Sequence, residues 1–311
     1  MTHDNEQFDP NRDPSKSLAA RIAASQTAFD MIRLRYPPQT AVVAQIDRVR
    51  LAAVGRRPGA ACGGAMLVAD FGVGKTESIL RAVAHVSKSV PAGDPRVPIL
   101  HLEMSSTGTP GSIPTAILAA LGAPRPDLGR EDLRWLKAVE MIRKRQVELI
   151  VVDEFNRAAR RPTMSRPIVT AIREKIMDAG VAPVVFVGSE EAGVVLRQCP
   201  EVVQRLDVHI DLPTYDSVLD MDAFIALASE LDSRLVDDGL LILPSDLGEA
   251  DVARALCQAS SGYIRRLMKI VRHAMTSAID RGAPSMKRAD LKIAVDEYAV
   301  RGGMIKRNPF A

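Results

Sequence analysis

The chain has 311 residues, of which 47% are hydrophobic and 25% are charged, and its formal net charge at pH 7 is +3. This length and balance exclude a disordered chain and predict a globular protein with one large domain or two unequal ones. A net charge this small is no reason by itself to expect nucleic-acid binding, so the placement of the basic residues matters more than their number.

The cysteines and the apolar runs indicate where the protein works. Cys62, Cys199 and Cys257 stand far apart, without Cys-X-X-Cys or Cys/His clustering, which predicts reduced thiols rather than zinc ligands or disulfides. No apolar run approaches the roughly 20 residues that a membrane-spanning helix needs, and the N-terminal run has no hydrophobic signal core. We therefore expect a cytoplasmic protein without a membrane partner.

The N-terminal part begins with a polar stretch. Residues 1–17 are rich in Asp, Asn, Pro and Ser, which predicts a disordered tail. Apolar residues from Leu18 to Arg35 recur at helical spacing and predict a helix that ends at the Tyr-Pro-Pro of residues 36–38. With a second helix over about 39–54, they form an expected N-terminal helical segment, residues 18–60.

Five short apolar runs follow, with helical stretches between them. Near-continuous apolar strands are typical of a parallel sheet that helices cover on both faces, and alternation of strand and helix predicts an α/β fold. We expect a five-stranded parallel core over residues 61–213. The predicted strands are residues 65–69, 97–103, 147–153, 182–188 and 208–212.

After Pro213 the pattern changes to helices alone. Helices are expected over residues 218–231, 247–260, 264–279 and 287–298, with no further strand of comparable quality. This predicts a small all-α lid domain over residues 214–299, followed by a C-terminal tail of residues 300–311. We expect residues 302–311 of this tail to be a docking segment for a partner or neighbour.

The stretch VADFGVGKTESIL, residues 68–80, joins the first predicted strand to a helix that starts near Lys75. A phosphate loop has the pattern Gly, four residues, Gly-Lys-Ser/Thr, and here Ala69 takes the first position. A strand, loop and helix in this order direct backbone N–H groups at one point and form an anion site. Ala69 is tolerable if its φ need not be positive, while Gly72 and Gly74 keep the loop flexible. The expected nucleotide-contacting residues are Ala69, Asp70, Phe71, Gly72, Val73, Gly74, Lys75, Thr76 and Glu77.

The chemistry of a nucleotide site follows from the residue types. Lys75 would reach the β- and γ-phosphates of ATP, and Thr76 would place its hydroxyl on Mg²⁺. The run LIVVDEFN is an apolar strand that ends in two carboxylates, of which Asp153 would hold Mg²⁺ through water and Glu154 would polarise the attacking water as general base. The alternative is a strand end that meets solvent, with Asp153 capping the next helix.

Three further residues complete the predicted site. Ser189 follows another strand and could hydrogen-bond the γ-phosphate or the attacking water, or equally cap the next helix. Arg205 lies just before the last strand and could reach the γ-phosphate of a neighbouring subunit, with a surface ion pair to Asp207 as the alternative. Arg265 opens a helix of the C-terminal domain and could move onto the nucleotide, with Arg266 as the fallback.

These motifs, in this order, resemble those of an AAA+ ATPase. They are AxxxxGKT at 69–76, VVDE at 151–154, VGS at 187–189, Arg205, and GYIRR at 262–266. More specifically, the chain resembles the TniB/TnsC family of transposition ATPases, relatives of MuB. The segments that carry this second resemblance are YPP, VVDEFNRA, PVVFVGSEEA, RLDVHIDLP, SSGYIRRLMKIV and the closing RNPFA.

The resemblance implies an ATP-dependent assembly of subunits around double-stranded DNA. It implies that the assembly marks a target, recruits and stimulates a DDE-type transposase, and receives instructions from a TniQ-like target-selection protein. In that scheme the protein hydrolyses ATP with Mg²⁺ and does no chemistry on DNA.

An arginine cluster predicts DNA binding independently of the resemblance. Arg157, Arg160, Arg161 and Arg166 fall within ten residues after the strand that ends in Asp153, with no acidic partner there. Phosphate contacts from such residues give sequence-independent affinity that falls with salt. The alternatives for the cluster are a solvated loop or a subunit interface. The loop at residues 105–112 could also meet the DNA backbone.

Two other functions remain open from the sequence. One is a helicase-loader or initiator-like ATPase with the same core and a different client. The other is a nucleotide-gated signalling or remodelling ATPase that never touches DNA.

Overall fold

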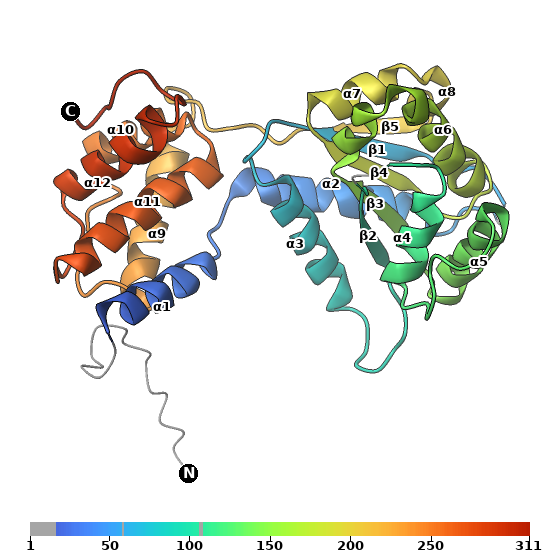
Figure 1. The fold of residues 1–311 in the computed structure, drawn as a ribbon, viewed down its shortest axis with the longest axis horizontal. Coiled ribbons are helices and arrows are strands. Elements are labelled where there is room, and N and C mark those ends of the chain that lie inside the picture. Colours follow the sequence, from blue (N-terminus) through green and yellow to red (C-terminus); the bar gives the residue numbers. More distant parts are fainter. Residues whose placement is uncertain (1–16, 58, 106–107) are drawn as a thin grey trace, which may run out of the picture. The chain divides into compact units, whose positions relative to one another are not determined.

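The computed structural model describes residues 17–57, 59–105 and 108–311, which form two compact units (Figure 1). One unit comprises Pro37–Pro213. The other comprises the described residues up to Tyr36 together with Thr214–Ala311. The expected disordered tail lies outside the described residues except for Ser17, as do two residues of the loop at 105–112. The expected N-terminal helical segment is divided between the two units.

The first unit is built on a five-stranded, all-parallel sheet, as predicted. The strands are β1 (Gly64–Val68), β2 (Ile99–Glu103), β3 (Leu149–Asp153), β4 (Val184–Gly188) and β5 (Leu206–Ile210). Their order across the sheet is β2-β3-β4-β1-β5. The register pairs Glu103 with Asp153 and Val68 with Gly188, so the carboxyl ends of four strands meet at one edge.

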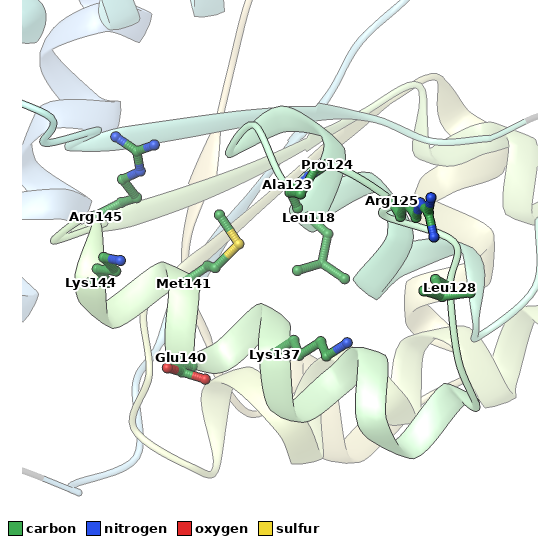
Figure 2. A pocket seen from close by; sticks show the side chains of 10 residues that line it. All are labelled: Leu118, Ala123, Pro124, Arg125, Leu128, Lys137, Glu140, Met141, Lys144 and Arg145. Carbon is green, nitrogen blue, oxygen red and sulfur yellow. The ribbon is translucent and has the colours of Figure 1, made fainter.

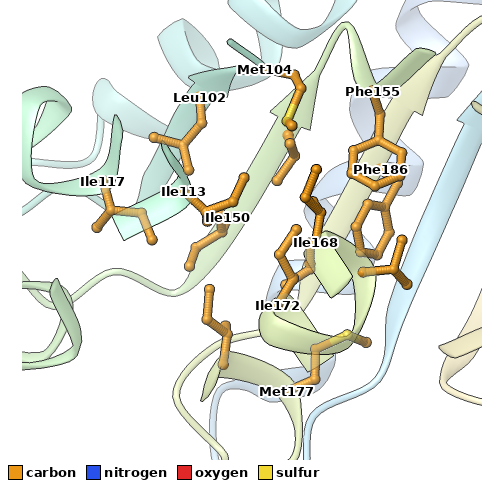
Figure 3. Close-up of a cluster of buried hydrophobic side chains, with 14 of the residues drawn as sticks. Leu102, Met104, Ile113, Ile117, Ile150, Phe155, Ile168, Ile172, Met177 and Phe186 are labelled. Carbon is orange, nitrogen blue, oxygen red and sulfur yellow. The ribbon is translucent and has the colours of Figure 1, made fainter. Parts of the chain in front are cut away.

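Helices cover both faces of this sheet, which explains the near-continuous apolar strands. They are α2 (Pro37–Ala53), α3 (Lys75–Ser87), α4 (Ser112–Ala120), α5 (Glu131–Lys144), α6 (Pro162–Ile172), α7 (Glu190–Arg197) and α8 (Pro200–Val203), with a 3-10 turn η1 (Phe155–Arg160) and a π-turn η2 (Arg173–Met177). Figure 3 shows the hydrophobic core of this unit, in which alternate residues of β2, β3 and β4 contact α4 and α6. Within this core the rings of Phe155 and Phe186 meet edge to face, with their centres 4.9 Å apart.

The prediction for the end of the first helix was wrong in detail. Helix α1 (Leu18–Asp30) ends well before Tyr36, and Pro37 and Pro38 begin α2 instead of ending α1. Proline suits the first turn of a helix, because the N–H that it lacks has no partner there in any case.

The second unit contains only helices among its described residues. They are α1, α9 (Met221–Asp237), α10 (Ala250–Ser260), α11 (Ile264–Asp280), α12 (Arg288–Val295) and the π-turn η3 (Asp296–Val300). Helix α1 joins α11 through Gln26 Nε2, which donates to Thr276 Oγ1 at 3.3 Å, and through the 3.4 Å ion pair of Arg272 with Asp30. No helix in the described ranges is long and apolar enough to cross a bilayer.

The C-terminal tail packs within its own unit. Asn308 Nδ2 donates to the carbonyl of Lys292 at 2.9 Å and to Asp296 Oδ1 at 2.8 Å. Phe310 is buried, and the guanidinium of Arg288 lies 5.2 Å from the centre of its ring. These contacts give the tail a structural role in its own chain.

Candidate nucleotide site

The loop between β1 and α3 has the backbone that a phosphate loop requires. Gly72 and Gly74 have φ of 85° and 99°, in the left-handed region that favours glycine. Ala69 has no positive φ, and its N–H donates to the carbonyl of Gly188 at 3.1 Å as a continuation of the sheet. The first glycine of the usual pattern is therefore not needed here, because alanine adopts this conformation without strain.

Lys75 is the first residue of α3, and its side chain reaches back into the loop. Its side chain is buried, and Nζ donates to the carbonyls of Ala69 and Asp70, each at 2.8 Å. Burial lowers the pKa of Lys75, and the charges of Glu154 and Asp153 oppose that shift. An ammonium held by neutral carbonyls among carboxylates suits exchange onto the oxygens of a phosphate, which are stronger acceptors.

Thr76 and Asp153 meet at the side of the loop. Thr76 Oγ1 donates to Asp153 Oδ2 at 2.8 Å, and the N–H of Glu154 donates to Oδ1 at 2.8 Å. Burial alone would raise the pKa of Asp153, but the nearby imidazole of His101 and the hydrogen bonds from Thr76 and the Glu154 backbone bring it below its ordinary value. The carboxylate therefore stays charged although it is almost fully buried.

The same pair of oxygens fits Mg²⁺. Mg²⁺ is commonly bound by one or two protein oxygens together with phosphates and waters rather than by an all-protein cage. Thr76 Oγ1 and Asp153 Oδ2 supply such a pair, and no cluster of three or more metal-ligating His, Cys, Asp or Glu side chains occurs in the described part of the chain.

The backbone conformation and the side-chain contacts of Glu154 fix its position in the site. Its φ of 55° lies in the left-handed region, which is uncommon for a residue other than glycine and turns the chain sharply after β3. Asn156 Nδ2 donates to Glu154 Oε2 at 3.4 Å, and Arg157 Nε lies 3.8 Å from the same oxygen. Its side chain is about one-third exposed, so water reaches it.

Ser189 directly follows β4, the strand that lies between β1 and β3. It is buried and stands at the N-cap position of α7, but its hydroxyl makes no capping bond to the backbone. Instead it donates to the carboxylate of Glu191, and this bond lowers the pKa of Glu191. Topology thus puts a polar hydroxyl between the phosphate loop and Asp153, as the sequence predicted for the edge of the sheet.

Arg205 lies at the opposite edge of the sheet. It comes directly before β5, whose first residue pairs with Gly64 at the start of β1, whereas the phosphate loop follows the end of β1. Its guanidinium pairs with Asp178 at 3.0 Å, not with Asp207 as the alternative interpretation held. Arg205 therefore cannot serve the nucleotide loop of its own subunit.

Arg265 belongs to the other unit, at the start of α11. Its role at the nucleotide stays a prediction. The fallback residue, Arg266, stacks its guanidinium on the ring of Tyr263 at 4.1 Å. This stacking occupies Arg266 within the helical unit.

The arginine cluster divides into two kinds of residue. Arg157 is partly buried: its Nη2 pairs with Glu103 at 2.6 Å and its Nη1 donates to the carbonyl of Met104 at 2.7 Å. The expectation of no acidic partner was therefore wrong for Arg157, because β2 brings Glu103 beside it, and also for Arg166, which has Glu201 as its partner. Arg166 is exposed and lies 3.7 Å from Glu201. Arg160 and Arg161 are exposed and form no ion pair among the described residues.

Two residues of the site were not predicted. His101 on β2 places Nε2 at 3.5 Å from Asp153 Oδ2, and Gln39 on α2 is buried and donates from Nε2 to the carbonyl of Gly74 at 3.3 Å. His101 is a polar residue between the apolar residues Leu100 and Leu102 of β2, which was a usable signal. Gln39 gave no signal in the sequence, because the periodicity of a helix does not show which element its face contacts.

Known proteins resemble this chain in sequence and fold. Residues 36–216, more than half of the chain, match the family model described as bacterial TniB protein. No curated protein sequence matches the chain. Among solved structures, the Aeropyrum pernix ORC1 protein in complex with DNA is 18% identical with a TM-score of 0.61, and the match covers 88% of this chain and 69% of that one.

Two further structures are similar. The Aeropyrum pernix ORC2 protein in its ADPNP-ADP complexes is 18% identical with a TM-score of 0.63, covering 87% of this chain and 71% of that one. Domain III of the Thermotoga maritima replication initiation protein DnaA is 13% identical with a TM-score of 0.51, covering 86% and 95%. At these identities the likeness concerns the fold.

Proposed function

The chain belongs to the bacterial TniB protein family and has the fold of AAA+ ATPases, and from these premises we propose that it is an ATP-dependent, DNA-binding regulator of transposition. In this proposal ATP binding assembles subunits on double-stranded DNA, and hydrolysis resets the assembly. The observation that carries the proposal is the convergence of Lys75, Thr76, Asp153 and Glu154 at one edge of the sheet.

In the proposed hydrolysis of ATP, each residue at the carboxyl ends of the strands has a role. Lys75 leaves the loop carbonyls for phosphate oxygens. Thr76 and Asp153 would hold Mg²⁺, which would neutralise charge on the phosphates. Glu154 accepts a proton from water as the water oxygen bonds to the terminal phosphorus. The bond from that phosphorus to the bridging oxygen breaks, and the products are ADP and inorganic phosphate. Ser189 orients the water or the terminal phosphate through its hydroxyl.

Arginines from outside the loop complete the site. Arg205 acts on the nucleotide of a neighbouring subunit, since it stands at the far edge of its own sheet. An arginine supplied in this way stabilises charge on the transferring phosphoryl group and makes hydrolysis depend on assembly. Arg265 of the helical unit contacts the nucleotide and distinguishes ATP from ADP. We expect Arg205→Ala to retain ATP binding and to lose hydrolysis in the assembled form.

DNA binding rests on the exposed part of the arginine cluster. Arg160 and Arg161 end the η1 turn that follows Glu154, and Arg166 projects from α6. We assign these three to the DNA backbone, because Arg160 and Arg161 form no ion pair among the described residues and the pair of Arg166 with Glu201 is exposed and long, at 3.7 Å, so phosphates can compete for it. Arg157 contributes to DNA binding through its contact with Glu154, which joins the arginine cluster to the nucleotide site. The assembled protein recruits a DDE-type transposase and responds to a TniQ-like protein, as expected for its family.

The central experiment measures retention of a random DNA duplex by the full chain with ATP, ADP or no nucleotide across a salt series. We expect ATP-dependent retention that falls with salt. Lys75→Ala should remove the ATP dependence, and Glu154→Gln should bind ATP and hold the assembled state. Equal retention in all three nucleotide conditions at every salt would reject the proposal, and normal turnover in Glu154→Gln would reject the assignment of the base.

A charge-reversal pair locates the DNA surface. Arg160→Glu/Arg161→Glu should lower the slope of log affinity against log salt by about 2, one for each phosphate that the variant no longer neutralises. The matched control is Arg48→Glu/Arg143→Glu, two exposed arginines on α2 and α5 of the same unit. If both pairs weaken binding equally, the effect is one of net charge and the assigned surface is wrong.

A helicase-loader or initiator-like function is the second candidate. The similarity of the fold to the ORC1 protein and to DnaA domain III favours it. It predicts preference for single strands or for a helicase over a transposase, which competition between single- and double-stranded DNA tests. A signalling ATPase without DNA binding would show no retention on either.

A further inference from the structure

A groove lies between α4 and α5 of the parallel-sheet unit, away from the nucleotide site (Figure 2). Its volume is about 450 Å³, within the range of ligand and peptide pockets. Leu118 and Met141 approach it from α4 and α5, and the chain at Ala123–Pro124 closes one side. The end of α5 that borders it leads into the start of β3, whereas the nucleotide residues stand at the strand ends.

Apolar side chains remain uncovered at and beside this groove. Leu128, which lines it, is 55% exposed, and Leu133 and Leu136 on α5 are 51% and 68% exposed. Leu133 lies one turn before Lys137 on the face of α5 that also carries Met141. Exposed apolar side chains that gather on one helix and the segment before it favour an interaction surface, because their burial against a partner is favourable.

Cations surround the apolar floor. Arg125, Lys137, Lys144 and Arg145 line the groove, and Glu140 is the single acid among its lining residues. Arg145 Nη1 donates to the carbonyl of Pro95 at 3.2 Å, while Arg125, Lys137 and Lys144 form no ion pair within the described ranges. An apolar floor surrounded by mainly positive side chains is typical of a protein interface, in which the charges at the rim select the partner.

We propose that this groove docks an acidic peptide segment of a partner protein, with apolar side chains of the segment seated on Leu128 and Met141, above the buried Leu118. A peptide that carries both kinds of residue satisfies both parts of the groove. A nucleic-acid backbone offers phosphates for the rim but no apolar group for the floor. The site is independent of the proposed DNA and nucleotide contacts, so it would recruit a partner without competing with them.

The test uses the full chain and a fluorescein-labelled amphipathic peptide of about four helical turns, with leucines along one face and glutamates elsewhere. Fluorescence anisotropy should show saturable binding. Replacing the leucines of the peptide by serine, or its glutamates by lysine, should weaken binding by about tenfold or more. Absence of saturable binding, or equal binding of the serine peptide, overturns the proposal.

Variants of the chain locate the binding. Lys137→Glu/Lys144→Glu should weaken binding by about tenfold at low salt, with the difference shrinking as salt rises. Leu128→Ser should weaken it by about fivefold at every salt. The control Lys88→Glu/Lys175→Glu changes two exposed lysines of the same unit that do not line the groove and should bind normally.

Two measurements keep the outcome decisive. ATP binding, which uses the other end of the strands, should be unchanged in all of these variants and so serves as the control for folding. If the groove variants bind the peptide normally, or if they lose retention of a DNA duplex while the peptide fails to bind, the groove is not a peptide site.

Discussion

Replacing Thr76 by valine tests the contact on which the magnesium site depends. Thr76 Oγ1 donates to Asp153 Oδ2 at 2.8 Å, and Asp153 is only 2% exposed. Valine has nearly the shape of threonine but no hydroxyl, so the buried carboxylate loses one donor. A buried polar group deprived of its partner costs about 1–3 kcal/mol. Because the N–H of Glu154 still donates to Asp153, we expect a loss near the middle of that range, about 2 kcal/mol.

The single tryptophan provides a specific assay. Trp135 is buried in the parallel-sheet unit, so its fluorescence follows the unfolding of that unit. With a urea slope of about 2 kcal/mol per molar, the loss should lower the unfolding midpoint by about 1 M. Thr76→Ser keeps the hydroxyl and should retain both the midpoint and magnesium-dependent ATP binding.

Two results would refute this reasoning. One is a midpoint for Thr76→Val equal to that of the unchanged protein, and the other is a loss in Thr76→Ser as large as that in Thr76→Val. A double-mutant cycle with Asp153→Ala should give a coupling energy of about 1–2 kcal/mol, since the two side chains are in direct contact.

Three further predictions concern the helical unit and the thiols. Asp290→Asn should destabilise α12 by about 3 kcal/mol, because this buried carboxylate pairs with Arg281 and accepts from Ser277 Oγ at 2.9 Å and from the N–H of Lys287 at 2.7 Å. Although burial alone would raise the pKa of Asp290, these donors hold it below the ordinary value. The stabilisation is therefore complete above the unfolded-state pKa and is lost as pH falls through the lower folded-state pKa. Hydrogen exchange of α12 in an acid series measures this loss of stability. Gly262→Ala should destabilise the unit strongly, because the φ of Gly262 is 74° and a Cβ would lie 1.9 Å from the carbonyl oxygen of Tyr215. Gly282 has a φ of 67°, but a Cβ there would meet only open space, so Gly282→Ala should cost only about 1 kcal/mol. Thermal unfolding measures both losses. Burial raises the pKa of Cys257 to about 11, and Cys62 and Cys199 are also buried, so iodoacetamide at pH 8 should label the three thiols only in urea, as mass spectrometry can show.

The strands of the sheet could be predicted because burial on both faces leaves a plain apolar signal. The prediction slipped at β5, expected at 208–212 and observed at Leu206–Ile210. β5 is an edge strand in which the middle residues are partly exposed, so polar Asp207 and His209 belong to it and the apolar run does not mark its bounds. A rule for fully buried strands fails where one side of the strand has no neighbour.

The partners of elements far apart in the sequence could not be predicted. Helix α1 shows an apolar face, but only the folded chain shows that this face meets α11 across the 250 positions between Gln26 and Thr276. The same limit applies within the site. Strand order brings His101 beside Asp153 and Glu103 beside Arg157, and local patterns carry no information about which strands become neighbours.

The position of Arg157 changes how the arginine cluster must be tested. Its guanidinium already holds Glu103 and the carbonyl of Met104, and its Nε lies 3.8 Å from Glu154. A contact from Arg157 to DNA would require it to give up part of this network, which includes the proposed catalytic base. A variant of Arg157 would therefore alter the site and the DNA surface together, and loss of DNA retention in it would identify neither. Arg160 and Arg161 have no such link among the described residues, so their reversal changes the DNA surface while leaving the contacts of Glu154 in place, and ATP turnover without DNA separates the two effects.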